Sequence, residues 1–193
     1  PEELKNVLFV SNHMGFLDIL AIASLYPMLF VTSVEMKNTP GLGLLTQMAG
    51  CLYTDRRRRG KIMDELNNIA EALKVGLNVV LYPESKATNG EAVLPFKRTL
   101  MMAAAHAQRP IQPLVVNFKE INGVQGFKRE WRDHVCWYDD MTFFTAFKNA
   151  LSLKSVTLEI EFLEQMHPRP EDDRGAVADQ AHALIAAKFI PVS

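Results

Sequence analysis

The sequence predicts an α/β fold: a single domain with a mainly parallel sheet flanked by helices. Short apolar runs typical of buried strands alternate along the chain with segments of helical period. Such alternation favours parallel strands with helices covering both faces of the sheet. The length of 193 residues fits one domain with a sizeable core, and 48% apolar with 22% charged residues is ordinary for a globular protein.

The buried strands expected in the first part of the chain are residues 7–10, 28–32, 51–55, 78–82 and 111–117. The helices expected between them are residues 17–25, 44–49, 61–75 and 95–107. The helix at 61–75 has the clearest pattern, because Ile62, Leu66 and Ile69 fall on one face and Gly76 ends it. The helix at 95–107 begins with a proline, which suits a first turn.

The last part of the chain has a different pattern. Residues 122–133 are a polar region without a clear period. Residues 156–162 alternate apolar and polar side chains, which predicts a half-exposed strand near a sheet edge. A final helix follows, with Asp172 or Asp173 as its cap.

An aromatic stripe of Phe143, Phe144 and Phe147 lies at helical spacing behind Asp140, which is expected to cap that helix. A stripe of this kind most often belongs to the core. The alternative is an amphipathic face that dips into a bilayer.

Composition excludes several classes of protein. The net charge is −1, so the chain lacks the basic field of nucleic-acid binders. Cys51 and Cys136 fit a reducing compartment or a single bridge, and no metal-binding spacing is present. No signal peptide is visible, and no apolar run reaches the roughly 20 residues that span a bilayer. The sequence begins at Pro1, so an upstream membrane anchor stays open.

One stretch carries the strongest sign of chemistry. The strand at 7–10 ends near Ser11, and His13 then falls in a turn where Gly15 permits a sharp bend. In a regular helix a spacing of five places two side chains about 140° apart, so only an irregular turn lets Asp18 accept a proton from His13. The other ring nitrogen is then free as a base, which is the base-and-orienter half of a catalytic triad.

No serine accompanies this pair as a nucleophile. An enzyme needs none when its substrate brings a hydroxyl, and His13 would take the proton of that hydroxyl as it attacks an activated acyl group. A histidine and an aspartate at this spacing also occur by chance with a structural role only. The rest of the chain therefore has to support the catalytic interpretation.

Polar clusters follow three of the predicted strands, at residues 13–18, 55–59 and 84–90. Ligands bind at the carboxyl ends of the strands in open α/β sheets. The sequence therefore predicts that these clusters converge on one site.

A run of arginines, residues 56–59, opens a predicted helix, where cations are unfavourable. A bound phosphate would resolve the conflict, because arginine holds phosphate through two hydrogen bonds. Arg56 lies closest to the strand end and is the expected phosphate ligand, with Arg57 or Lys86 as helpers. Glu84 is expected to position the hydroxyls of the acceptor or to organise the arginines, although an ordinary loop carboxylate is the alternative.

In order and spacing these clusters resemble the four sequence blocks of the glycerolipid acyltransferases, the lysophosphatidate acyltransferase type. The blocks correspond to Asn12 to Asp18 with its His-x4-Asp pattern, residues 50–56, residues 82–90 and residues 111–116. The resemblance spans residues 6–118, and residues 119–193 are expected to complete the sheet and its helical cover within one domain, 1–193.

The resemblance implies a fatty acyl transfer from acyl-CoA or acyl carrier protein to the free hydroxyl of a lysophospholipid, with 1-acylglycerol-3-phosphate as the expected acceptor. In this interpretation His13 is the general base and Asp18 orients it. Backbone amides near Gly15 or Gly90 are the candidates for stabilising the oxyanion. No metal or cofactor is expected besides the acyl donor. The resemblance also implies a site at the cytoplasmic face of a membrane, reached peripherally or through an anchor absent from this sequence.

The third block departs from its usual form, Phe-Pro-Glu-Gly-Thr-Arg-Ser. Ser85, Lys86 and Ala87 replace Gly-Thr-Arg. Lys86 can offer only a point charge where arginine offers a fork. Ser33 stands where many members have lysine. An acceptor other than lysophosphatidate therefore stays open.

Two other functions remain as alternatives. An acyl-thioester hydrolase would keep His13 and Asp18 but use water as the nucleophile. A catalytically silent domain that binds lipid or membrane would use the basic run and the aromatic stripe. A nucleic-acid module is the weakest alternative, because neither interleaved aromatic residues nor a basic total supports it.

Overall fold

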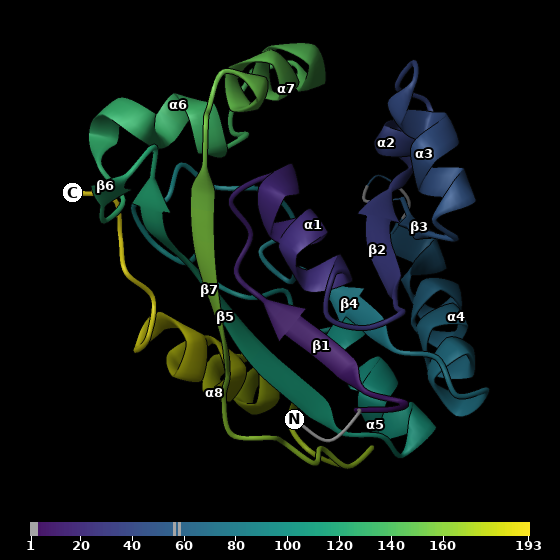
Figure 1. The fold of residues 1–193 in the computed structure, drawn as a ribbon. Helices are drawn as coiled ribbons and strands as arrows, with labels where there is room; N and C mark the ends of the chain where they lie inside the picture. Colours follow the sequence, from purple (N-terminus) through teal and green to yellow (C-terminus); the bar gives the residue numbers. More distant parts are fainter. Residues whose placement is uncertain (1–3, 56, 58) are drawn as a thin grey trace.

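The structure, a computed structural model, describes residues 4–55, 57 and 59–193, and its centre is a twisted sheet (Figure 1). The sheet contains seven strands in the order β3-β2-β4-β1-β5-β6, with β7 also paired to β5. The strands are β1 (Leu8–Ser11), β2 (Leu29–Ser33), β3 (Leu52–Thr54), β4 (Val79–Leu81), β5 (Ile111–Ile121), β6 (Val124–Gln125) and β7 (Val156–Phe162). The first five are parallel to one another, and β6 and β7 run antiparallel to β5.

The α-helices are α1 (Phe16–Ala23), α2 (Val34–Lys37), α3 (Leu42–Met48), α4 (Ile62–Lys74), α5 (Ala103–Ala107), α6 (Arg132–Val135), α7 (Phe143–Leu151) and α8 (Arg174–Ala186). Short 3-10 turns occupy Arg59–Lys61, Leu100–Met102 and Arg129–Trp131. The predicted α/β class, with a mainly parallel sheet between helices, is confirmed.

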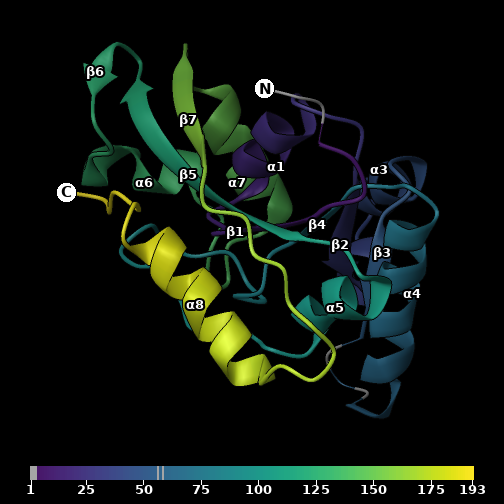
Figure 2. The same ribbon diagram turned by 90° about the horizontal axis from the view of Figure 1, so that it is seen from below.

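Helices cover both faces of the sheet. Figure 2 shows α4, α5 and α8 on one face and α1 with α7 on the other. Because side chains alternate along a strand, Leu8 and Val10 of β1 pack in the α4–α5–α8 core, whereas Phe9 packs in the core beneath α1. All three are fully buried. The central strands are therefore apolar on both sides, as the sequence predicted for parallel strands.

A third apolar cluster extends beyond the end of β1. It joins Met14 to Phe118, Phe127 and Cys136, all of them buried. The Trp137 amide donates to the Met14 carbonyl at 2.7 Å. The second half of the chain thereby packs against the turn that carries His13.

The structure corrects several element predictions. Residues 95–99 are not helical, because the Lys97 amide donates to the carbonyl of Pro83 and holds this segment against the loop after β4. The polar region at 122–133 contains β6 and the start of α6. The short helix α2 was not predicted. The strand at 156–162 is confirmed as β7, which pairs with β5.

Helix caps gave one confirmation and one error. Asp173 caps α8 by accepting from the Ala176 amide at 2.8 Å. Thr142, and not Asp140, caps α7 by accepting from the amide of Thr145.

The prediction that the aromatic stripe of α7 is core was wrong. Phe144 and Phe147 are exposed, with 61% and 41% of their surface accessible. Only Ala146 of this helix is buried, because α7 packs through one narrow face. Phe143 and Phe147 contact Phe16 at the start of α1, with ring centroids about 6 Å apart.

Candidate active site

The turn after β1 is attached to β5 by a side chain. The Asn12 amide group donates to the Val116 carbonyl at 3.0 Å and accepts from the Val116 amide at 2.9 Å. Asn12 is buried and so replaces the next pair of ladder hydrogen bonds beyond the end of β1. This arrangement fixes where the chain leaves the sheet, one residue before His13.

The loop after β4 holds the backbone of His13 on both sides. Glu84 Oε1 accepts from the His13 amide at 2.7 Å. The His13 carbonyl accepts from the Thr88 amide at 2.9 Å and from its hydroxyl at 3.2 Å. These contacts form because β1 and β4 are neighbours in the sheet and both end at the same edge.

The predicted contact between His13 and Asp18 is present. Nδ1 of the ring lies 3.1 Å from Oδ1 and 3.2 Å from Oδ2 of the carboxylate. Asp18 is the third residue of α1, and its Oδ2 also accepts from the amides of Met14 at 2.6 Å and Gly15 at 3.0 Å. The turn between His13 and α1 is thus irregular and folds back around the carboxylate, as the spacing required.

This geometry gives the two ring nitrogens different roles. Because a carboxylate only accepts, the contact with Asp18 places the ring proton on Nδ1 and leaves the lone pair of Nε2 open. Asp18 is buried, whereas 17% of the His13 side chain is accessible, and no described residue makes a hydrogen bond to Nε2. The pair can accept a proton from a group that approaches the ring and can stabilise the imidazolium that results.

Glu84 acts on the protein itself. Its side chain is buried, with Oε1 accepting from His13 and Oε2 accepting from the Leu94 amide at 2.7 Å. This differs from the predicted contact with acceptor hydroxyls or arginines. Burial raises the pKa of the Glu84 carboxyl to about 7, against the lowering effect of the two amide hydrogen bonds.

The basic residues are not gathered at His13. Arg56, the predicted phosphate ligand, lies outside the described residues. Arg57 is exposed, and its Nε lies 3.5 Å from Oε1 of Glu35. Both follow β3, which is separated from β1 by β2 and β4. Lys86 is exposed on the loop after β4, the loop that also holds the His13 backbone.

The amides proposed for the oxyanion are already engaged. The Gly15 amide donates to Asp18, and the Gly90 amide faces the Thr88 hydroxyl at 3.4 Å. Gly90 is buried with φ 79°, and a Cβ there would lie 2.4 Å from the Phe127 ring. The backbone of Gly15 is extended, so no sharp bend requires a glycine there. The position is crowded instead, because a Cβ would lie 3.0 Å from the Val135 carbonyl oxygen.

Several supporting residues escaped the sequence analysis. Asn12 was noted only as part of a motif, and Thr88 and Leu94 were not singled out. The partners of Asn12 and Thr88 lie 104 and 75 residues away in sequence, and the strand order brings them together, whereas Leu94 meets Glu84 within the loop after β4. The order and adjacency of β1, β4 and β5 were the missing information.

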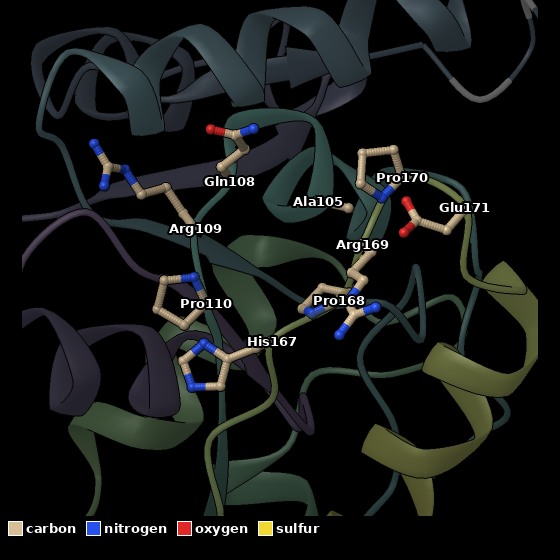
Figure 3. A pocket seen from close by; sticks show the side chains of 9 residues that line it. All are labelled: Ala105, Gln108, Arg109, Pro110, His167, Pro168, Arg169, Pro170 and Glu171. Carbon is tan, nitrogen blue, oxygen red and sulfur yellow. The ribbon is translucent and has the colours of Figure 1, made fainter.

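A separate hollow lies at the opposite edge of the sheet (Figure 3). It is lined by Ala105 of α5, by residues 108–110 between α5 and β5, and by the segment 167–171. Figure 3 shows the Arg109 and Arg169 side chains pointing in different directions. This hollow contains none of the predicted site residues.

Two kinds of feature are absent from the described part of the chain. It contains no group of three or more His, Cys, Asp or Glu side chains placed to hold a metal ion. It also contains no helix with the length and apolar character needed to cross a membrane.

Comparison with known proteins identifies the family. The acyltransferase family model matches residues 2–117, which includes β1 to β4 and most of β5. The chain belongs to the acyltransferase family. The resemblance drawn from the four blocks is therefore confirmed.

Curated members of this acyltransferase family resemble most of the chain. A protein named 1-acyl-sn-glycerol-3-phosphate acyltransferase from Neisseria gonorrhoeae is 30% identical over 187 residues, covering 97% of this chain and 71% of its own length. A Brucella abortus protein named lyso-ornithine lipid O-acyltransferase is 29% identical over 180 residues, covering 89% of this chain and 67% of its own length.

A solved acyltransferase shares the fold. The crystal structure of the 1-acyl-sn-glycerophosphate acyltransferase PlsC from Thermotoga maritima superposes with a TM-score of 0.64. Its sequence is 18% identical, and the match covers 98% of this chain and 66% of that chain. The fold of the acyltransferase therefore extends over both halves of this sequence, including the part beyond the family-model match.

Proposed function

We propose that this acyltransferase moves a fatty acyl group from an acyl thioester to the free hydroxyl of a lysophospholipid. The observation that carries the proposal is the His13–Asp18 pair, with Nε2 of His13 open at the carboxyl edge of the sheet. Family membership and the names of the Neisseria and Brucella relatives support the class of acceptor.

In the proposed reaction His13 Nε2 takes the proton of the acceptor hydroxyl as its oxygen attacks the thioester carbon. Asp18 holds the ring in place and stabilises the imidazolium. The tetrahedral intermediate then collapses, the carbon–sulfur bond breaks, and the imidazolium returns its proton to the leaving thiolate. The products are the ester and the free thiol, so no protein nucleophile and no further reactant are needed.

The proposed acceptor is 1-acylglycerol-3-phosphate, and the proposed donor is acyl-CoA or acyl carrier protein. Arg56, Arg57 and Lys86 remain the proposed phosphate contacts. A lyso-ornithine lipid is the second candidate acceptor, because Lys86 and Ala87 stand where the third block usually carries Thr-Arg and the Brucella relative bears that name. Loss of the arginine fork weakens the case for a phosphate monoester.

We also propose that the enzyme works at a membrane surface, at its cytoplasmic face. Figure 1 shows α1 below α7, with α3 further to the right beyond β2 and α2, and all three helices expose large apolar side chains. Leu20, Met48 and Phe144 are 60%, 77% and 61% accessible. Exposed apolar residues on helices suit contact with the headgroup region of a bilayer.

Acyl transfer tests this function directly. Labelled acyl-CoA, and separately acyl carrier protein, is offered with lysophosphatidate, lyso-ornithine lipid or no acceptor. His13→Ala is compared with His106→Ala, which removes an exposed histidine on α5. We expect transfer by the wild type and by His106→Ala, and a loss of at least about a thousandfold with His13→Ala.

The outcomes separate the candidates. Preference for lyso-ornithine lipid would keep the chemistry and change the acceptor. Release of free fatty acid without acceptor would favour the hydrolase. Lipid binding that survives His13→Ala, with no transfer to any acceptor, would favour a silent lipid-binding domain.

A further inference from the structure

Tyr82 contacts the candidate base without having a part in the proposed reaction. It is the first residue after β4, and its ring stacks on the His13 ring with centroids 4.0 Å apart and planes 18° from parallel. Because Asp18 holds the edge of the imidazole and Tyr82 covers one face, rotation of the ring is restricted on two sides.

The Tyr82 hydroxyl is buried and forms no hydrogen bond with a described residue. It lies near the Asp18 carboxylate: burial, followed by the negative charge of Asp18, raises the pKa of the phenol well above its ordinary value. The phenol therefore keeps its proton and remains a donor. An unpaired buried hydroxyl is costly, and Asp18 is the charged acceptor beside it.

We propose that Tyr82 is a positioning residue for the His13–Asp18 pair: its ring fixes and stabilises the imidazolium, and its hydroxyl, unpaired in this structure, is a second donor available to the Asp18 carboxylate. The assignment rests on the proposed function only in giving His13 the role of base. The Tyr82 hydroxyl is buried, so it is not exposed to a substrate.

The two parts of the side chain have opposite effects on His13. The face of an aromatic ring attracts a cation, so the ring favours protonated imidazole. A donor to Asp18 withdraws negative charge from the same contact, so the hydroxyl disfavours protonated imidazole.

Among the described residues, two other titratable groups face the pair. Glu84 lies at the His13 amide, and Cys136 lies in the segment packed against the turn, where burial and then the charge of Asp18 raise the pKa of its thiol. The thiol therefore stays neutral. Since Glu84 titrates near pH 7, Glu84→Gln is needed as a background in which a change near neutrality belongs to His13.

The experiment follows the ring titration of His13 by NMR, with its signal assigned by its absence in His13→Gln. In Tyr82→Phe, which keeps the ring, we expect the titration midpoint to rise by roughly half a pH unit. Tyr82→Met fills the space without a π face. In this variant we expect the titration midpoint of His13 to lie below the midpoint in Tyr82→Phe by a similar amount. Both comparisons are repeated in the Glu84→Gln background.

Kinetics supply a second readout. The acid limb of the pH–rate profile is expected to move with the ring titration in each variant. Tyr82→Met is expected to lower kcat on the order of tenfold at little change in KM, because it loosens the base and not the substrate.

The result can overturn either part of the assignment. An unchanged midpoint in Tyr82→Phe would remove the role of the hydroxyl, and equal midpoints in Tyr82→Phe and Tyr82→Met would remove the role of the ring. Tyr82→Phe is nearly isosteric, so the hydroxyl is tested even if Tyr82→Met fails to fold. Absence of acyl transfer in the wild type would count against the proposed function alone, since the titration needs no substrate.

Discussion

At the scale of single residues, His13 is held at its ring, its amide and its carbonyl by two different parts of the chain. Asp18 comes from the helix that follows, and Glu84 and Thr88 come from the loop after β4. A base with its backbone fixed in this way loses little entropy when a substrate arrives. The predictions at this scale concern the two carboxylates, which have separate tasks.

Asp18→Asn is expected to lower kcat by on the order of 10³ to 10⁴ while leaving the fold intact. An amide group presents a donor where Asp18 accepts from Nδ1, so the ring would turn to the wrong tautomer. Acyl-transfer kinetics measure this, with Asp179→Asn on the exposed face of α8 as the matched control. Equal losses in both variants would contradict the role of Asp18.

Glu84→Gln is expected to change how stability depends on pH. The pKa of Glu84 is raised from its ordinary value of 4.5 to about 7, so the folded protein holds a proton that the unfolded chain has lost between these pH values. The protonated Glu84 carboxyl therefore contributes about 3 kcal/mol to the free energy of unfolding. This contribution is complete below pH 4.5 and is lost as the pH rises through 7.

Urea unfolding at pH 5 and pH 8 checks this. The wild type is expected to lose unfolding free energy relative to Glu84→Gln between the two pH values. A difference between the proteins that is the same at both pH values would show that the carboxyl titrates at its ordinary pKa.

At the scale of elements, the turn between β1 and α1 depends on close packing. Gly15 lies against the Val135 carbonyl oxygen, and the Trp137 amide donates to the neighbouring Met14 carbonyl. The segment that follows α6 thus forms one wall of the turn. The position of His13 depends in this way on residues more than a hundred places further along the chain.

Gly15→Ala is expected to destabilise the protein by about 1 to 3 kcal/mol, because the added methyl group forces this wall and the turn apart. It is also expected to lower kcat more than KM rises, since the displaced turn carries His13. Gly60→Ala is the matched control, because no described residue lies within 4 Å of a Cβ at Gly60. Thermal unfolding and acyl-transfer kinetics of both variants make the comparison, and equal Tm values would refute the argument from crowding.

At the scale of the whole molecule, the sequence predicted local features better than distant ones. The strands and the His13–Asp18 contact follow from short-range patterns, and both are present. The contact of Glu84 with His13 spans 71 residues and depends on β4 lying beside β1, which no local pattern encodes. The aromatic stripe on α7 was misassigned for a related reason. Its periodicity shows which side chains share one face of the helix, but it does not show whether another element covers that face.

The exposed apolar surface gives a prediction for the intact molecule. The double substitution Phe144→Ser with Phe147→Ser is expected to reduce binding to phospholipid vesicles by on the order of tenfold, since it removes two large apolar side chains from the proposed membrane face. Activity on a short-chain, fully dissolved lysolipid is expected to stay near that of the wild type. Vesicle sedimentation measures the binding, and acyl transfer to the dissolved lysolipid measures the activity. Unchanged vesicle binding would place the membrane contact elsewhere.

The eleven residues of β5 have a consequence for where this protein can be divided. Its first residues pair with β1, and from Leu114 onward it pairs with β7, so one strand is shared between the two halves of the sheet. A polypeptide ending at residue 117, where the family-model match stops, would lose every partner on the β7 side and also the wall behind Met14. Such a fragment would present an open apolar strand edge. We expect this fragment to aggregate on expression, and co-expression with residues 118–193 to recover soluble protein. The segment that the family model matches would then be shorter than the segment that folds.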